Sequence, residues 1–187
     1  MIPRPTDFPA IDPATGLVNA IIETPKQARA KLDYDPETGY YKLHDVLPEG
    51  FTFPFNFGFV PSTLAEDGDP LDVLVCTDAI LPTGSLLTVR LLGVIEAEET
   101  VKNRSNRNDR LIATPSGDPA AASLTSIDQL RPEFLDQIER FFRNYGEFKG
   151  KQWKTLGRGG PDRALALIER AIEQRRRDGQ KPSSSSQ

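Results

Sequence analysis

Asp67, Asp69 and Asp72 lie in one short segment of the chain that also contains Gly68 and Pro70. Asp67 and Asp69 are two positions apart, so in an extended backbone they project to the same side. Pro70 fixes one backbone dihedral and Gly68 permits a tight approach, which allows a stiff loop. Clustered carboxylates raise each other's pKa unless a cation lies among them. Oxygen ligands of this kind suit Mg²⁺ or Mn²⁺, so the segment predicts a site for a hard divalent cation.

A solvated turn is the simpler interpretation of the same segment, because Asp, Gly and Pro are common turn residues. An EF-hand loop is a poor match, since the glycine falls at its second position and the expected glutamate is missing. The apolar run 73–75 directly after Asp72 predicts a buried strand that would anchor the loop. These residues alone leave the turn and the metal site both open.

The composition excludes several other classes of function. The chain has 187 residues, enough for one domain with a sizeable core. The formal net charge of −4 disfavours non-specific binding to nucleic acid, so no nucleic-acid partner is expected. Neither a leader-like apolar segment at the N-terminus nor an apolar run near 18 residues is present, so we expect no membrane partner and a cytoplasmic protein.

Histidine and cysteine are scarce, which limits the kinds of metal site. His44 is the single histidine, so a zinc site built on several histidines and a two-histidine iron site are excluded within one chain. Cys76 is the single cysteine, so it cannot form a disulfide within the chain. Its place after the run 73–75 predicts an inert core thiol.

The chain divides into a domain with two tails. Residues 1–16 contain four prolines and predict an extended arm. Residues 17–175 are expected to form the domain. Residues 176–187 end in a run of serines and predict a disordered polar tail.

The first half of the domain reads as β-structure. A turn at 36–39 separates two strand-like segments and predicts a hairpin. Five phenylalanines at period two in 51–60 predict an aromatic strand. Further strands are expected at 71–76, 85–95 and 111–114, with a polar, mobile loop over 96–109.

The second half reads as helical. A helical region is expected from near Ser126, and another helix from Pro161. The first is expected to bury a stripe of residues with helical spacing: Leu135, Ile138, Phe142 and Tyr145. The second is expected to bury Ala164, Leu165, Ile168, Ala171 and Ile172. The order of elements indicates an α+β fold, most simply a small closed antiparallel β-barrel with two main helices outside.

Several motifs together resemble the family I soluble inorganic pyrophosphatases. They are the segment 67–75 (DGDPLDVLV), 22–25 (IETP), 30–33 (AKLD), 53–58 (FPFNFG) and 141–145 (FFRNY). The resemblance covers roughly residues 17–175 and implies an OB-like, five-stranded barrel. It also implies Mg²⁺-dependent hydrolysis of pyrophosphate and a homo-oligomer.

The resemblance assigns roles to individual residues. Asp67 and Asp72 match metal ligands, and Asp69 matches the carboxylate that accepts a proton from the attacking water. The other matching residues are Glu23, which faces metal-bound water, Glu99 and Asp109 as further metal ligands, and Lys31, Arg110 and Tyr145, which contact phosphate. Each also has a plainer interpretation, such as a surface lysine, a local ion pair or a core tyrosine.

The chain departs from the family pattern at the site itself. Asp45 and Gly146 stand where an arginine and a lysine are usual, which changes the charge near a polyanion by three units. Phe53 and Phe57 replace tyrosines, and Asp33 replaces a glutamate. Asn108 stands for one aspartate of the metal cage, and Asp109 next to it is the alternative. The candidates to replace the missing cations are Arg104, Arg107, Lys149 and Lys151.

These departures leave two main hypotheses open. In the first, the protein is a pyrophosphatase with a reduced rate. In the second, it has lost turnover and binds phosphate, a nucleotide or a protein partner. A phosphohydrolase with a larger substrate lies between them, with the arginine-rich segment 102–110 as its recognition element.

Overall fold

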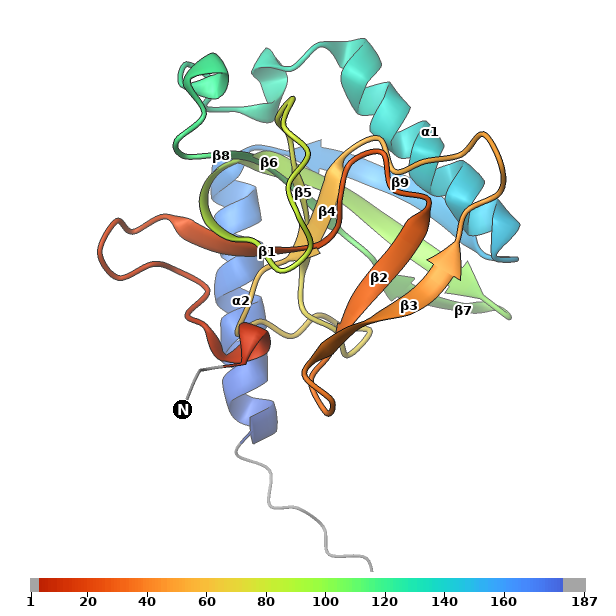
Figure 1. Cartoon of the computed structure of the whole chain (residues 1–187), viewed down its shortest axis with the longest axis horizontal. Coiled ribbons are helices and arrows are strands. Elements are labelled where there is room, and N and C mark those ends of the chain that lie inside the picture. The colour runs from red at the N-terminus through yellow and green to blue at the C-terminus, as the bar shows by residue number, and fades with distance from the viewer. Residues whose placement is uncertain (1–3, 180–187) are drawn as a thin grey trace, which may run out of the picture.

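A computed structural model describes residues 4–179 of the chain as a ring of strands flanked by two long helices (Figure 1). The strands are β1 (Val18–Thr24), β2 (Ala30–Asp35), β3 (Tyr40–Val46), β4 (Asn56–Phe59), β5 (Asp72–Val75), β6 (Leu86–Val101), β7 (Arg104–Arg107), β8 (Arg110–Pro115) and β9 (Gln152–Gly159). The long helices are α1 (Pro132–Phe148) and α2 (Pro161–Gly179). Three short 3-10 helices span Pro5–Asp7, Pro119–Ala121 and Ile127–Gln129.

Five strands pair in a closed circuit. Along the sheet the order is β1, β4, β5, β8 and β6, and β6 pairs with β1 again, so the circuit has no free edge. The expectation of antiparallel strands was wrong for one pair, because β5 and β8 run parallel. The sheet is therefore mixed, with the β5–β8 pair beginning at Asp72 and Arg110.

The two helices lie on different sides of the ring, as Figure 1 shows. Helix α2 packs on β6 and buries Ala164, Ile168 and Ala171 in one core cluster. Helix α1 packs on β9, and its buried Leu135, Ile138 and Phe142 belong to a second cluster, as expected. Leu165 was expected to be buried with α2 but is exposed, because it lies off the face that meets the sheet.

The hairpin β2–β3 was correctly predicted, and it stands beside the ring rather than within it. Gly39 has φ of +75°, which the turn requires and which glycine adopts without steric cost. Three hydrogen bonds attach the hairpin to β1: Leu32 N donates to Thr24 Oγ1 at 3.0 Å, Thr24 Oγ1 donates to Leu32 O at 3.2 Å, and Tyr34 N donates to Glu23 Oε1 at 2.7 Å. The backbone of β2 is therefore held against the end of β1.

The polar loop predicted for 96–109 is instead a second hairpin. Strand β6 continues through Val101 and pairs with β7. Lys102 and Asn103 both have positive φ, 48° and 66°, which fits the two-residue turn that joins tightly paired strands. Polarity on both faces indicated a loop, but regular backbone pairing does not require apolar side chains at a sheet edge.

Three other expectations for regular structure need correction. The aromatic segment is a strand only over β4, and the phenylalanines before it lie in irregular chain. The long helix begins at Pro132 rather than near Ser126, where a separate 3-10 helix intervenes. Strand β9 was not predicted, because its sequence lacks an apolar alternation and its pairing partner β6 lies far away in the chain.

The ends of the domain also differ from expectation. The predicted extended arm contains the 3-10 helix Pro5–Asp7, and Ala10 is buried against the domain. Helix α2 continues to Gly179, so the part of the predicted tail over 176–179 is helical. The rest of that tail, 180–187, lies outside the described residues. No helix within 4–179 is long and apolar enough to cross a membrane.

The packing of α2 predicts different costs for two neighbouring truncations. Ile168→Ala should lower the free energy of unfolding by about 2–5 kcal/mol, because it leaves a cavity under the helix. Leu165→Ala on the exposed side should cost less than about 1 kcal/mol. Urea unfolding followed by circular dichroism measures both, and equal losses would contradict the observed orientation of α2.

Candidate active site

The three aspartates sit on a hydrogen-bonded loop that leads into β5. Ala65 N donates to Asp69 O at 2.7 Å, and Asp69 N donates to Asp67 Oδ1 at 3.2 Å. Gly68 has φ of +95°, which accounts for the glycine at the tip of this turn. Asp67 and Asp69 are exposed, whereas Asp72 is the first residue of the buried strand. The segment is therefore a turn, and it also exposes the Asp67 and Asp69 carboxylates to solvent.

Asp72 and Arg110 face each other at the start of the parallel pair β5–β8. Val73 pairs with Leu111, so the residues before them lie side by side, and Arg110 Nη1 is 2.5 Å from Asp72 Oδ2. The buried Arg110 guanidinium also lies over the ring of Phe142, 4.7 Å from its centroid. Burial raises the pKa of Asp72 to about 6, although Arg110 lowers it. Asp67 and Asp69 also raise it, which shows that the three aspartates act as one cluster.

Glu23 and Lys31 reach the same cluster from β1 and β2. Glu23 is 8% exposed, and burial raises its pKa to about 8, with Asp33 and Asp72 adding to the rise. Lys31 pairs with Asp33, whose other oxygen is 2.6 Å from His44 Nδ1. Lys31 also lies over the ring of Phe57, 5.6 Å from its centroid.

Tyr145 forms the α1 side of the site. Its ring stacks on Phe141 with centroids 6.1 Å apart and contacts Phe53 at 5.9 Å. Burial raises the pKa of Tyr145, and the nearby carboxylates of Asp45 and Asp33 raise it further. The hydroxyl is therefore a neutral hydrogen-bond donor at ordinary pH, next to the β2–β3 hairpin.

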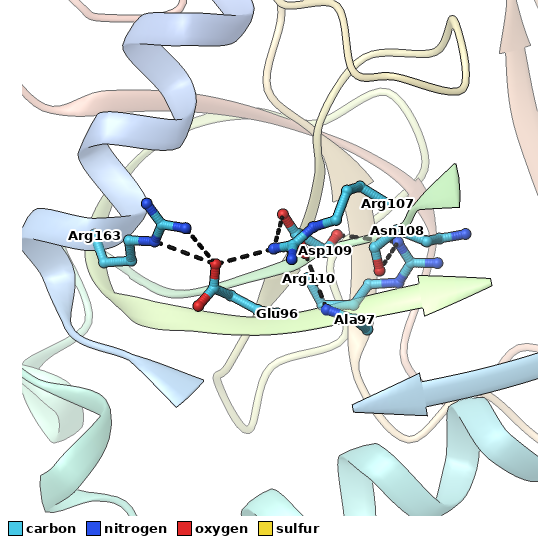
Figure 2. Close-up of polar contacts among 7 residues, drawn as sticks. All are labelled: Glu96, Ala97, Arg107, Asn108, Asp109, Arg110 and Arg163. Carbon is cyan, nitrogen blue, oxygen red and sulfur yellow. Dashed lines mark hydrogen bonds and ion pairs between the residues drawn. The ribbon is translucent and has the colours of Figure 1, made fainter. Parts of the chain in front are cut away.

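Asp109 is held by the protein, as Figure 2 shows. Ala97 N donates to Asp109 Oδ1 at 2.9 Å, and Arg107 Nη2 lies 2.8 Å from the same oxygen. Arg107 also pairs with Glu96, which binds Arg163 of α2 at 2.6 Å. The network fixes the β6–β7 hairpin to α2, so Asp109 has a structural role already.

Two other predicted cage residues have different surroundings. Glu99 Oε2 accepts a hydrogen bond from Lys151 Nζ at 2.9 Å. The side-chain oxygen of Asn108 is buried and has no partner within residues 4–179. A cavity of about 690 Å³ adjoins the cluster and runs from the aspartate loop past Asn108 to Arg163 and Arg170 of α2.

The donor chemistry of the cluster fits a hard divalent cation. Its ligands are carboxylates; burial raises the pKa of both Asp67 and Asp72, and the neighbouring aspartates raise it further. Within residues 4–179, however, no three acidic, histidine or cysteine side chains are already gathered around one point as metal ligands. Arg110 lies against Asp72, so its guanidinium already supplies positive charge next to this carboxylate.

Comparison with known proteins identifies the family of this fold and site. The family model described as inorganic pyrophosphatase matches residues 20–176. The chain belongs to the inorganic pyrophosphatase family. An inorganic pyrophosphatase of Synechocystis is 33% identical over 86% of this chain and 93% of its own length. One of Sulfolobus acidocaldarius is 36% identical over 86% of this chain and 92% of its own.

Solved structures agree with this family assignment. The crystal structure of the Thermus thermophilus inorganic pyrophosphatase superposes with a TM-score of 0.84 and 31% identity, covering 93% of this chain and 99% of that one. The Helicobacter pylori enzyme gives a TM-score of 0.79 with 34% identity, covering 86% and 94% of the two chains. The ring of strands and its two helices are therefore the pyrophosphatase arrangement.

The structure brings most of the predicted residues of this pyrophosphatase-family site together. Glu23, Lys31, Asp67, Asp69, Asp72, Arg110 and Tyr145 share one electrostatic neighbourhood. From the sequence, Lys149 and Lys151 were only two of four candidates to replace the missing cations. The structure places Lys149 Nζ 2.8 Å from Asp45 Oδ2 and Lys151 beside Glu99. Their only sequence signal was a pair of lysines after a helix.

The buried carboxylate of Glu23 predicts a pH-dependent stability. Its pKa is about 8 in the folded protein and 4.5 ordinarily, so the folded state binds more protons between those values and loses stability as pH rises from 4.5 to 8. Glu23→Gln, which keeps an acceptor for Tyr34 N, should raise the free energy of unfolding at pH 8 by about 1–4 kcal/mol. The gain should disappear near pH 4.5.

Denaturant unfolding in EDTA at several pH values measures this effect. Glu37→Gln, in an exposed turn, is the control and should leave the pH dependence unchanged. A stability profile of Glu23→Gln parallel to that of the unmodified protein would contradict a protonated, buried Glu23.

Proposed function

We propose that this protein hydrolyses inorganic pyrophosphate to two phosphates with Mg²⁺. The observation that carries the proposal is the meeting of the aspartate cluster with Lys31 and Arg110: both cations lower the pKa of Asp72, and both aspartates of the loop raise it. A metal-bound diphosphate needs both kinds of group. The carboxylates bind the metal ions, and the lysine and arginine side chains bind the phosphate oxygens. The family membership supports the same reaction.

Asp67 and Asp72 would hold the metal, and Glu23 would line the site through water. When bound, Mg²⁺ lowers the pKa of a bound water and neutralises phosphate charge. Glu99 and Asp109 would be additional ligands, but Lys151 already engages one oxygen of Glu99, and Ala97 N and Arg107 already engage Asp109. The core of the metal site is therefore assigned to the loop and β5.

Asp69 would accept the proton of the attacking water. Its side chain is exposed on the loop between Asp67 and Asp72, and it accepts no hydrogen bond from residues 4–179. A carboxylate that is not already engaged can accept a proton without first breaking another contact. Lys31, Arg110 and the Tyr145 hydroxyl would orient the phosphates, because all three are donors: Lys31 and Arg110 act on Asp72, and Tyr145 lies near Arg110.

One observation favours a second candidate, a site that binds a phosphate ligand without turnover. Arg110 lies on Asp72, and no cage of three ligands is formed among the described residues. In this alternative the guanidinium takes the place of a metal, and the site retains an anion without activating water. The same assay that tests the first function separates the two.

Two further features are proposed with this function. The closed circuit of five strands supports an OB-like barrel, with the β5–β8 pair carrying the site. The homo-oligomer expected from the family resemblance stays a prediction, which light scattering of the purified protein measures.

Phosphate release from pyrophosphate tests the proposed role of Asp69. Asp69→Asn should lower Mg²⁺-dependent turnover by about a hundred-fold or more, since general base catalysis contributes on this scale. Mg²⁺ binding, followed by calorimetry, should remain. Asp78→Asn, at a fully exposed position outside the site, should keep full turnover.

Two results would overturn the role or the reaction. Turnover of Asp69→Asn equal to that of Asp78→Asn would remove Asp69 from the mechanism. A folded, Mg²⁺-binding wild-type protein without phosphate release would leave the binding function instead.

A further inference from the structure

The short connection 149–151 between α1 and β9 brings two lysines to the rim of the site. Lys149 Nζ lies 2.8 Å from Asp45 Oδ2, and Lys151 Nζ lies 2.9 Å from Glu99 Oε2. Their side chains remain 30% and 38% exposed, so neither ammonium group is sealed in the core. Both lysines are held by a carboxylate and are still open to a solute.

Gly146 explains how this connection comes so close to the helix end. Lys149 N and Lys151 N both donate to Gly146 O, each at 2.9 Å. A Cβ on Gly146 would lie 3.3 Å from Lys151 O and 3.4 Å from Trp153 Cβ, which is tighter than most such contacts. A side chain at 146 would therefore require the connection to shift by a few tenths of an ångström. In this chain residue 146 has no side chain, and the two cations come from the connection instead.

The first of these lysines is next to the phosphate-binding side of the site. Asp45 lies directly opposite Lys31 in the register of β2 and β3. A side chain that pairs with Asp45 therefore approaches the position that Lys31 occupies. Asp45 and Glu99 also both raise the pKa of Tyr145, so the carboxylates of the two lysine–carboxylate pairs lie near that residue.

Charge favours an exchange of partners at these two pairs. The carboxylates Asp45 and Glu99 each neutralise one lysine in the free protein. A diphosphate carries more negative charge than one carboxylate and offers several acceptor oxygens, so it competes well for an ammonium group. Partly exposed ion pairs are weak, which makes the exchange inexpensive.

We propose that Lys149 and Lys151 are phosphate-binding residues of this site, and that Asp45 competes with the substrate for Lys149. The proposal rests on the proposed function for the identity of the ligand, a Mg²⁺-bound diphosphate. Lys149 contacts the phosphate group nearer the β2–β3 hairpin, and Lys151 contacts the group nearer β6. In this chain the two lysines replace cations that β3 and α1 do not provide.

Binding of methylenediphosphonate, a diphosphate that is not hydrolysed, tests the proposal by calorimetry with Mg²⁺ present. Lys149→Gln should weaken binding about ten-fold or more, as expected for the loss of a charge-assisted hydrogen bond. Lys149→Arg keeps the cation and should stay within about three-fold of wild type. Lys151→Gln should weaken binding in the same direction. Lys154→Gln, at an exposed position of β9, is the control and should bind like wild type.

A double-mutant cycle tests the competition by Asp45. Asp45→Asn releases Lys149 and should tighten binding by about two- to five-fold. The gain should vanish when Lys149→Gln is also present, because no ammonium group remains to be released. An equal gain in both backgrounds would show a general charge effect and overturn the competition.

The outcomes separate this inference from the reaction. Weakened binding by Lys149→Gln, in a protein without phosphate release, would support the lysine roles and reject hydrolysis. Phosphate release by wild type, with Lys149→Gln and Lys151→Gln binding like Lys154→Gln, would support hydrolysis and reject the lysine roles. A wild-type protein that binds no methylenediphosphonate would overturn both.

Discussion

The ion pair between Asp72 and Arg110 is the contact around which the site is built. It exists because β5 and β8 run parallel and in register, so that both strands begin at the same edge of the ring. A buried charge is costly unless it is paired, and this pair also contacts Lys31 and the aspartate loop electrostatically. The Phe57 and Phe142 rings under the guanidinium exclude water from one side. The position of Arg110 thus depends on the core cluster that contains both rings and the buried face of α1.

The rest of the fold brings side chains from distant segments of the chain to this edge of the ring. Strand β1 contributes Glu23, and its hydrogen bond to Tyr34 N ties the β2–β3 hairpin alongside. Helix α1 contributes Tyr145, whose ring is held in place by packing on the rings of Phe141 and Phe53. The network of Arg107 with Asp109 and Glu96 fixes the far side to α2. Rigid supports of this kind keep clustered like charges from moving apart.

The elements that the sequence predicted correctly are mostly set by interactions between residues close together in the chain. The β2–β3 hairpin and the beginning of α2 were predicted, because turn residues and a proline at the first helical position act locally. Strand β9 was missed because its pairing partner β6 lies far away in the chain. The β6–β7 hairpin was read as a loop because its side chains are polar on both faces. Asn103, which tolerates positive φ, was the one local signal for the second turn. Leu165 was misplaced because helical spacing leaves the edge of a buried face uncertain.

Residue types and their order were enough to establish the chemistry of the segment 67–72, the family, and the residues at which this chain departs from it. Which of those residues are engaged by other side chains is visible only in the folded chain. Asp109 is bound to Ala97 and Arg107, and Lys149 meets Asp45 from 104 positions away. The type and spacing of residues fix what a side chain can do. Its partners come from distant parts of the chain and are set only when packing brings those parts together.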